Sequence, residues 1–89
     1  EQLADTKKSI FTEKYNRFRE LIVKARKEAG LSQGEIAKKL NRPQSFVSKY
    51  ERGERRIDIV EFLEVAKAIG INPLQIIKAL KQVAEKEQK

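Results

Sequence analysis

Residues 31–53 read LSQGEIAKKLNRPQSFVSKYERG, and this stretch decides the fold. Ser32 and Glu35 have the spacing of a capping box, which predicts that a helix begins just after Ser32. Asn41 tolerates a positive φ and ends this helix, and Pro43 suits the first turn of the helix that follows. The stretch therefore predicts two short helices that are joined by a tight turn.

The apolar residues of this stretch fit a helix-turn-helix unit that extends from Gln33 to Arg52. Ala37 is small at the point where the two helix axes must approach each other closely. The other apolar positions recur at helical spacing and predict the contacts inside the unit: Ile36, Leu40, Val47 and Tyr50.

Three further helices are expected around this unit. One spans about residues 13–29, one follows the capping box of Asp58 and Glu61, and one runs over residues 73–89. The sequence contains no alternating apolar pattern that would predict a strand. The expected fold class is therefore all-α, with five compactly packed helices. The expected organisation is a flexible or weakly ordered segment over residues 1–12 and one domain over residues 13–89.

The chain has 89 residues and contains no Cys and no His. These absences exclude disulfides, thiol nucleophiles, Ser-His-Asp triads and the usual zinc ligand sets. The sequence has no Gly-rich phosphate loop, and its acidic pairs at helical spacing suit caps and solvated faces. We therefore expect no enzymatic activity, no metal site, no cofactor and no small-molecule ligand.

No apolar run approaches the ~20 residues that a membrane span requires, and no signal peptide is recognisable. A chain without disulfides suits a reducing compartment, so we expect a cytoplasmic protein without membrane contact. The chain begins with Glu1 rather than Met, which indicates a trimmed N-terminus or a piece of a longer protein.

The whole chain has a net charge of +7, and the positive charge is concentrated in its middle. Residues 14–56 hold 13 basic and five acidic residues, whereas residues 57–89 hold five of each. Such a block attracts polyanions, of which nucleic acid is the commonest. A solvated surface that binds nothing is the alternative explanation of the charge.

Two stretches together resemble the Xre/Cro family of lambda-repressor-like DNA-binding domains. They are residues 31–40, which begin Leu-Ser-Gln, and residues 45–55, which contain Ser-Lys-Tyr-Glu-Arg-Gly. The resemblance covers about residues 16–74 and implies an all-α fold whose second short helix enters the major groove of double-stranded DNA. This sequence departs from the family's usual pattern in the turn. Asn41 stands where Gly is usual, Arg42 stands where an apolar residue is usual, and Pro43 stands where Ser or Thr is usual.

The resemblance assigns base contacts to the second short helix, at Gln44, Ser45 and Lys49. A Gln side chain can form two hydrogen bonds with adenine, and Lys can donate to guanine. Ser48 is a further candidate because it lies on the same face of the helix. Phe46 either touches a thymine methyl group or a sugar, or it packs half-buried on the preceding helix.

A different set of residues is expected to contact phosphates. Ser32 and Gln33 stand at a helix N-terminus, where backbone N–H groups favour anions. Arginines that flank the recognition helix can fix its register without reading sequence, and the candidates are Arg42, Arg52, Arg55 and Arg56. Glu54 lies among them and is expected to point away from DNA or to pair with an arginine.

The resemblance also implies one structural ion pair. In similar domains the Glu of the Glu-x-Gly pattern bonds a basic residue of the first helix. The matching residues here are Glu51 and Arg26, so this pair is expected to tie the first helix to the recognition helix.

The last expected helix is apolar over a wide arc. One side of it can cover the core, and the other side is a candidate two-fold dimer surface with Ile76, Leu80 and Val83 as the expected contacts. The alternative is a monomer whose last helix only covers its own core.

These features predict a sequence-specific regulator of transcription that binds double-stranded DNA. We expect a repressor that binds a near-palindromic operator as a homodimer. The alternative is a protein-interaction or antitoxin module in which DNA binding is secondary.

Overall fold

The structure is a computed structural model that describes the backbone of residues 2–88 and the side chains of residues 13–82. Over residues 2–88 the chain forms helices and no strand, which confirms the all-α prediction. The helices are α1 (Gln2–Glu28), α2 (Gln33–Leu40), α3 (Gln44–Arg52), α4 (Ile59–Ile69) and α5 (Pro73–Gln88).

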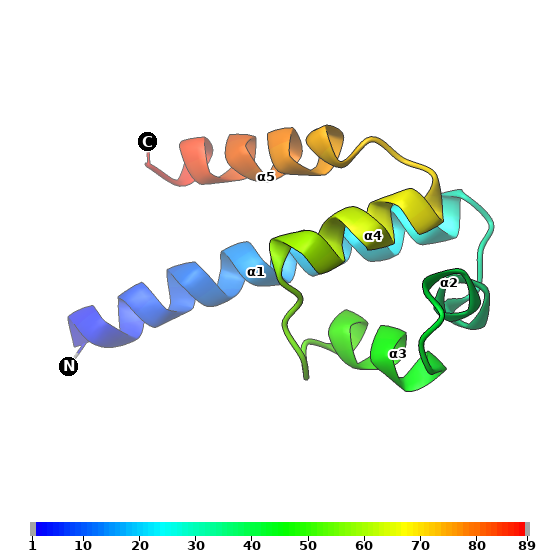
Figure 1. Ribbon diagram of the computed structural model, residues 1–89. Helices are drawn as coiled ribbons and strands as arrows, with labels where there is room; N and C mark the ends of the chain where they lie inside the picture. The colour runs from blue at the N-terminus through cyan, green and yellow to red at the C-terminus, as the bar shows by residue number, and fades with distance from the viewer. Residues whose placement is uncertain (1, 89) are drawn as a thin grey trace.

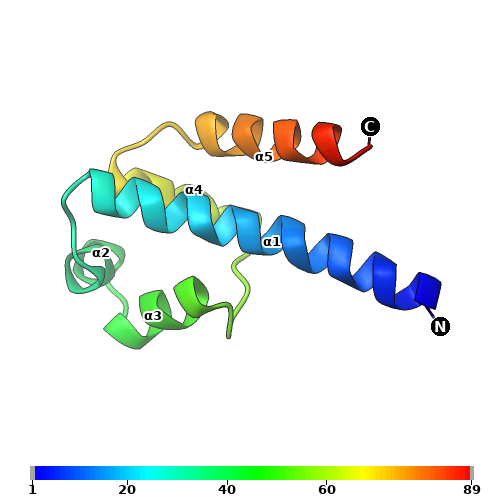
Figure 2. The same cartoon turned by 180° about the vertical axis from the view of Figure 1, so that it is seen from behind.

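Helix α1 is the longest helix, and α3, α4 and α5 pack against it (Figure 1). Helices α2 and α3 contact each other most closely and lie on one side of α1. Helix α4 lies beside α1, and α5 packs against both of them on the side away from α2 and α3 (Figures 1 and 2). The helix-turn-helix unit therefore forms one end of the molecule, with α3 on an outer face.

The hydrophobic core draws at least one side chain from every helix. Its members are Ile22 of α1, Ile36 and Ala37 of α2, Phe46, Val47 and Tyr50 of α3, Phe62, Val65 and Ile69 of α4, and Ile76 of α5. Phe18 of α1 adds an edge contact to Phe62, with ring centroids 5.2 Å apart. Each fully buried Ile, Val or Phe stabilises the fold by about 1.5–3 kcal/mol.

The predicted capping residues determine where α2 and α4 begin. The backbone N–H of Glu35 donates to Ser32 Oγ at 3.0 Å, and the N–H of Ser32 donates to Glu35 Oε1 at 2.8 Å. Asp58 and Glu61 form the same reciprocal pair at the start of α4, at 2.7 and 3.0 Å. Asn41 ends α2 with φ 57°, which is the left-handed conformation expected for it.

The start of α1 differs from the sequence prediction. The expected helix begins at about residue 13, whereas α1 begins at Gln2. Residues 2–12 contain no Gly and no Pro, and adding a residue to an existing helix is much less unfavourable than nucleating one. The helix therefore continues toward the N-terminus without the apolar periodicity on which the predicted boundary rested.

The predicted role of Ile76 as a dimer contact needs correction. Ile76 is 7% exposed and belongs to the core of its own protomer, so it has little surface to offer a second copy. On α5 it is the neighbouring Ile77 that is exposed, at 42%. The sequence shows two adjacent apolar stripes, but it does not show which of them the helix turns inward. Leu80 is half-buried, and the side chain of Val83 lies outside the described residues.

Gly53 ends α3 where a side chain would not fit. Its φ is +83°, and a Cβ atom there would lie 2.9 Å from Nε of Arg19 on α1. Arg19 cannot move away freely, because its Nη1 donates to the backbone carbonyl of Glu51 and its Nη2 donates to Asn16.

We predict that Gly53→Ala lowers the free energy of unfolding more than Gly30→Ala does. Gly30 also has a positive φ, of +73°, but a Cβ atom there would have no neighbour within 4 Å. Gly30→Ala should therefore cost only the left-handed strain of about 1–2 kcal/mol. Gly53→Ala should cost about 1 kcal/mol more, because Arg19 must give up a hydrogen bond.

Guanidinium-chloride unfolding of both variants measures this difference. Equal destabilisation by the two substitutions would show that Arg19 does not restrict the end of α3.

Candidate nucleic-acid interface

Helix α3 is divided lengthwise into a polar half and a buried half. At 3.6 residues per turn, Gln44, Ser45, Ser48 and Lys49 share one half of its circumference. Gln44, Ser45 and Lys49 are exposed, and Ser48 is half-exposed, with its Oγ donating to the Ser45 carbonyl at 3.3 Å. The other half is buried and consists of Phe46, Val47, Tyr50 and Glu51. The structure thus places all four candidate base contacts together on the outer face of α3.

Phe46 belongs to the core rather than to the outer face. It is 8% exposed and makes an edge contact with Tyr50 at a centroid distance of 5.4 Å. Of its two possible roles, the structure therefore supports packing, and the burial is deeper than the half-buried position considered from the sequence.

Ser32 and Gln33 stand at the N-terminus of α2, but both side chains are engaged within the protein. Ser32 Oγ caps the helix, and Gln33 Nε2 donates to Glu51 Oε1 at 2.8 Å. A phosphate at this position would therefore meet mainly backbone N–H groups, which the macrodipole of the helix makes more attractive to anions.

Three of the four candidate phosphate-binding arginines lie near a carboxylate. Arg52 donates to both carboxylate oxygens of the exposed Glu54, at 2.8 and 3.1 Å, and these bonds lower the pKa of Glu54. Arg55 forms a two-bond pair with Glu61, and Arg42 lies 3.9 Å from the same carboxylate. The pairing of Glu54 with an arginine is one of the two outcomes that the sequence allowed.

Arg56, the fourth candidate, stacks on an aromatic ring instead. Its guanidinium carbon lies 4.4 Å from the ring centroid of Tyr15 on α1. The Tyr15 hydroxyl in turn accepts a hydrogen bond from the backbone N–H of Ile57 at 3.2 Å. The end of the loop that joins α3 to α4 is therefore fixed to α1.

Arg26 and Glu51 form the ion pair that the resemblance implies. Arg26 Nε donates to Glu51 Oε2 at 2.7 Å, and Arg26 Nη2 donates to Glu51 Oε1 at 3.1 Å. The two residues are 9% and 8% exposed, and the hydrogen bonds that Arg26 donates to Glu51 raise the pKa of Arg26. Arg26 also donates to the backbone carbonyl of Leu31 at 2.8 Å, so one side chain links α1, the loop before α2, and α3.

Arg19 is a residue of this network that the sequence analysis did not identify. It stands seven residues before Arg26, about two helical turns, and therefore on the same face of α1. Its Nη1 donates to the Glu51 carbonyl at 2.6 Å. This seven-residue spacing of two arginines was the signal that could have identified it.

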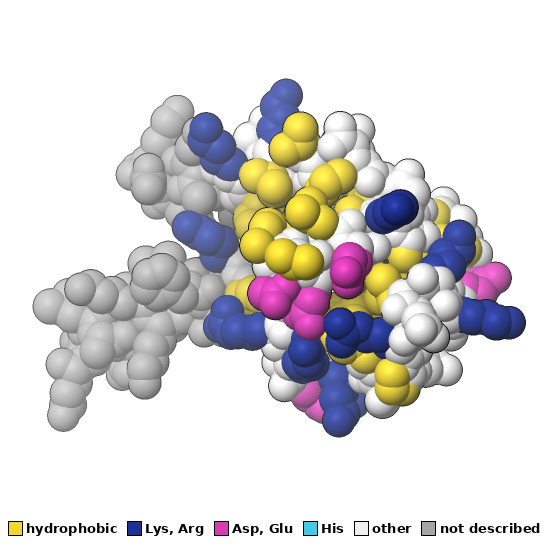
Figure 3. Space-filling view, viewed as in Figure 1, with side chains coloured by type: hydrophobic (Ala, Val, Ile, Leu, Met, Phe, Trp, Pro, Cys, Tyr) yellow, Lys and Arg dark blue, Asp and Glu magenta, His cyan; other side chains and the backbone are white. Residues whose placement is uncertain are grey.

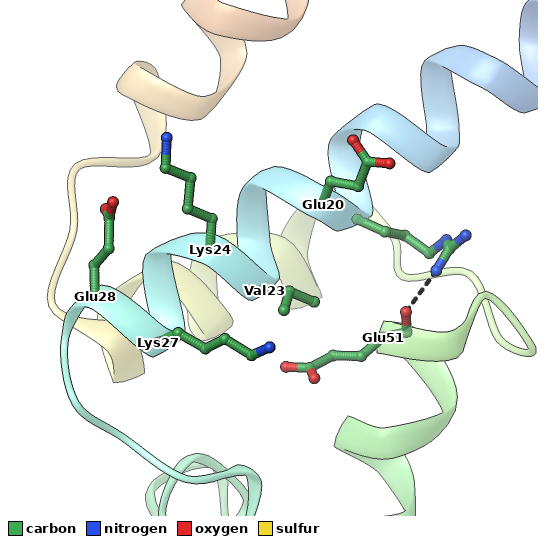
Figure 4. A pocket seen from close by; sticks show the side chains of 7 residues that line it. Glu20, Val23, Lys24, Lys27, Glu28 and Glu51 are labelled. Carbon is green, nitrogen blue, oxygen red and sulfur yellow. Dashed lines mark hydrogen bonds between the residues drawn. The ribbon is translucent and has the colours of Figure 1, made fainter.

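An open cleft lies between α1 and the end of α3, beside this network (Figure 4). Val23 forms part of its lining, and Lys27 points along the helix toward Glu51, whereas Lys24 and Glu28 point away from Glu51. The dashed line in Figure 4 is the hydrogen bond from Arg19 to the Glu51 carbonyl. The cleft therefore adjoins the back of the recognition helix rather than its outer face.

In the part of the chain that the structure describes, no three acidic side chains lie close enough together to hold a metal ion. No helix there combines the length and the apolar character that crossing a membrane requires.

Comparisons with known proteins agree with this geometry. The sequence model of a family described as helix-turn-helix matches residues 22–76. An uncharacterized HTH-type transcriptional regulator, y4dJ of Sinorhizobium fredii, is 31% identical over 52 residues, which are 58% of this chain and 68% of that protein. A solved structure described as an XRE-family like protein from Pseudomonas syringae pv. tomato str. DC3000 is 39% identical. It superposes with a TM-score of 0.85, over 89% of this chain and 96% of that chain.

We predict that Glu51→Gln destabilises the protein by about 3 kcal/mol, because it leaves the buried guanidinium of Arg26 without a counter-charge. Glu54→Gln is the matched control, since it removes a carboxylate that also accepts two bonds from an arginine but is exposed. Exposed ion pairs contribute little, so this control should unfold at nearly the wild-type denaturant concentration.

Chemical denaturation at neutral pH compares the two variants. If they unfold at the same denaturant concentration, the Arg26–Glu51 pair does not hold the helices together.

Proposed function

This chain belongs to the Xre/Cro-type helix-turn-helix DNA-binding domains, and from this premise we propose that it is a transcriptional repressor that binds a near-palindromic operator as a dimer. Helix α3 enters the major groove, and the residues that flank it bind phosphates on either side. The observation that carries the proposal is the division of α3 into a buried apolar half and an exposed half with four polar side chains.

The exposed half of α3 offers complementary chemistry to base edges. Gln44 supplies both a donor and an acceptor, which matches the N7 and N6 atoms of adenine. Lys49 supplies donors for guanine, and Ser45 and Ser48 can donate or accept. Since Lys and Gln select different bases, we infer that the protein discriminates between DNA sequences.

Phosphate contacts would come from the arginines and from the start of α2. Arg42, Arg52, Arg55 and Arg56 all stand within a few residues of α3, and the side chains of Arg42 and Arg55 are 39% and 41% exposed. DNA phosphates would replace Glu54 at Arg52, because a phosphate ester is an equally good acceptor and brings additional contacts.

The proposed dimer is supported by an exposed apolar patch on α4 and α5. The patch comprises the large hydrophobic residues that are most exposed: Ile59, Val60, Leu63, Leu74 and Ile77. Figure 3 shows hydrophobic side chains gathered over the first turns of α5 and the start of α4, with acidic side chains along their lower edge. An apolar centre with a charged rim is typical of a protein interface.

The same patch supports the second candidate function, a protein-interaction module. In that case a different protein would cover the patch, and DNA binding would be secondary. The two candidates differ in whether the purified chain alone selects a DNA sequence.

Selection of binding sites from random duplex DNA at two salt concentrations tests the proposal. A repressor dimer should enrich a short palindrome whose half-sites are about 34 Å, or one helical turn, apart. Its affinity should fall steeply with salt. Salt-sensitive binding without an enriched sequence would favour the interaction module.

We predict that Gln44→Ala and Lys49→Ala each relax the base preference at one position of the selected site. Each substitution should cost about 1–3 kcal/mol of discrimination there. Lys67→Ala is the control, because it removes an exposed lysine from α4, away from α3. Competition binding against single-base variants of the site provides the measurement, and an equal loss on every sequence would contradict base readout.

We also predict that Ile77→Lys converts the dimer to a monomer. Ile77 lies in a mainly apolar groove formed with Ile59, Phe62 and Leu80, where burying an ammonium group is unfavourable. Gln75→Lys adds the same charge to an exposed position of α5 and should leave the dimer intact. Sedimentation equilibrium distinguishes the states, and a wild-type protein that is itself monomeric at high concentration would refute the dimer.

A further inference from the structure

Phe46 of α3 supports two arginines that come from opposite ends of the helix. Arg42 precedes α3 and Arg55 follows it, yet both guanidinium carbons lie near the Phe46 ring, 4.5 and 4.8 Å from its centroid. The negative face of an aromatic ring attracts a guanidinium group, which is planar and weakly hydrated. The ring therefore provides a common support for one cation from each flank of the recognition helix.

Glu61 of α4 lies next to these two cations. Its carboxylate accepts from Nη1 and Nη2 of Arg55 at 3.2 and 2.9 Å, and Nη2 of Arg42 lies 3.9 Å from Oε2. It also accepts the backbone N–H of Asp58 at 3.0 Å as part of the cap of α4. These hydrogen bonds, first of all those from Arg55, lower the pKa of Glu61 and keep it charged.

The exposures of the three side chains show which groups remain accessible. The Glu61 side chain is 14% exposed, whereas those of Arg42 and Arg55 are 39% and 41% exposed. The Glu61 side chain is therefore mostly covered, whereas the side chains of Arg42 and Arg55 remain partly accessible beside α3. A guanidinium group has five N–H donors, so Arg55 can bind a phosphate and keep its bonds to Glu61.

We propose that Glu61, although acidic, strengthens DNA binding by positioning Arg42 and Arg55 beside Phe46 for phosphate contact. This proposal rests on the proposed function, because it assigns Glu61 a role in binding the DNA backbone. Two arginines that share one ring repel each other, and the carboxylate next to both offsets this repulsion. An arginine already held in place also loses less conformational freedom when it binds a phosphate.

General electrostatics predicts the opposite effect for a carboxylate near DNA. Glu61 repels phosphates, so its removal should strengthen binding if it has no positioning role. The sign of the change in affinity therefore decides between the two explanations.

Glu61→Gln is the informative variant. Glutamine also completes a capping box, so the start of α4 keeps its hydrogen bonds while the charge is lost. Glu64→Gln is the matched control, because Glu64 is an exposed residue of the same helix. Thermal unfolding of both variants verifies that they are folded at the temperature of the binding experiment.

The experiment measures the dissociation constant for a fluorescently labelled, mixed-sequence duplex over a series of salt concentrations. We expect Glu61→Gln to bind about tenfold more weakly than wild type. Its salt slope should be smaller by about one unit, as for the loss of one phosphate contact. Glu64→Gln should bind as tightly as wild type or slightly more tightly.

A second comparison tests whether Glu61 acts through the arginines. In an Arg55→Gln background, Glu61→Gln should weaken binding much less than it does in wild type, because its principal partner is gone. An undiminished loss would mean that Glu61 acts by another route and would overturn the proposal.

The remaining outcomes are distinguishable. If Glu61→Gln binds as tightly as Glu64→Gln or more tightly, Glu61 has no positioning role, although the proposed function stands. If the wild-type protein itself shows no salt-dependent binding to the duplex, the proposed function fails, and the inference about Glu61 fails with it.

Discussion

The position of the recognition helix depends on the buried ion pair between Arg26 and Glu51. Glu51 occupies the inner half of α3, where an unpaired carboxylate would be strongly unfavourable, and Arg26 supplies its counter-charge from α1. Gln33 of α2 donates to the same carboxylate, and Arg19 donates to the Glu51 backbone carbonyl. The pair together with Gln33 thus joins three helices through directional bonds that apolar packing cannot provide. Apolar contacts bring α3 to α1, but this network determines its rotation and therefore which of its residues face outward.

Carboxylates have a second role around α3, where they organise arginines at the surface. Glu54 and Glu61 engage Arg52 and Arg55, and Glu61 also lies near Arg42. The high positive charge of residues 14–56 is therefore not a set of free cations, because part of it is engaged with nearby carboxylates. Such pairs fix where the guanidinium groups lie, and in the proposed complex phosphates of DNA would compete for the exposed ones. An acidic residue near the interface can accordingly favour DNA binding or oppose it, depending on how deeply its carboxylate is buried.

Local features of the fold follow from the sequence because short-range chemistry determines them. The capping boxes at Ser32 and Asp58 and the left-handed residue Asn41 locate helix ends, and helical periodicity locates the outer face of α3. Ile76 was misplaced because α5 has two adjacent apolar stripes, and only packing against α1 and α4 decides which one is buried. The shared support of Arg42 and Arg55 on Phe46 could not be predicted, since it depends on how the segments before and after α3 turn back toward the Phe46 ring. Neither segment is helical, so no regular spacing in the sequence indicates these contacts.

The chemistry of the outer face explains why precise positioning matters for this protein. Of the four polar side chains on that face of α3, two are serines, which accept or donate and so discriminate weakly between bases. In the proposed complex, Gln44 and Lys49 would be the strong discriminators, and two contacts would define only a short half-site. Lysine is flexible, so its donors would reach one guanine reliably only if the helix backbone were held at a fixed depth and rotation in the groove. The Arg26–Glu51 pair fixes the rotation from behind, and phosphate contacts on both flanks would fix the depth. Two such half-sites in a dimer would then supply the selectivity that a single recognition helix lacks.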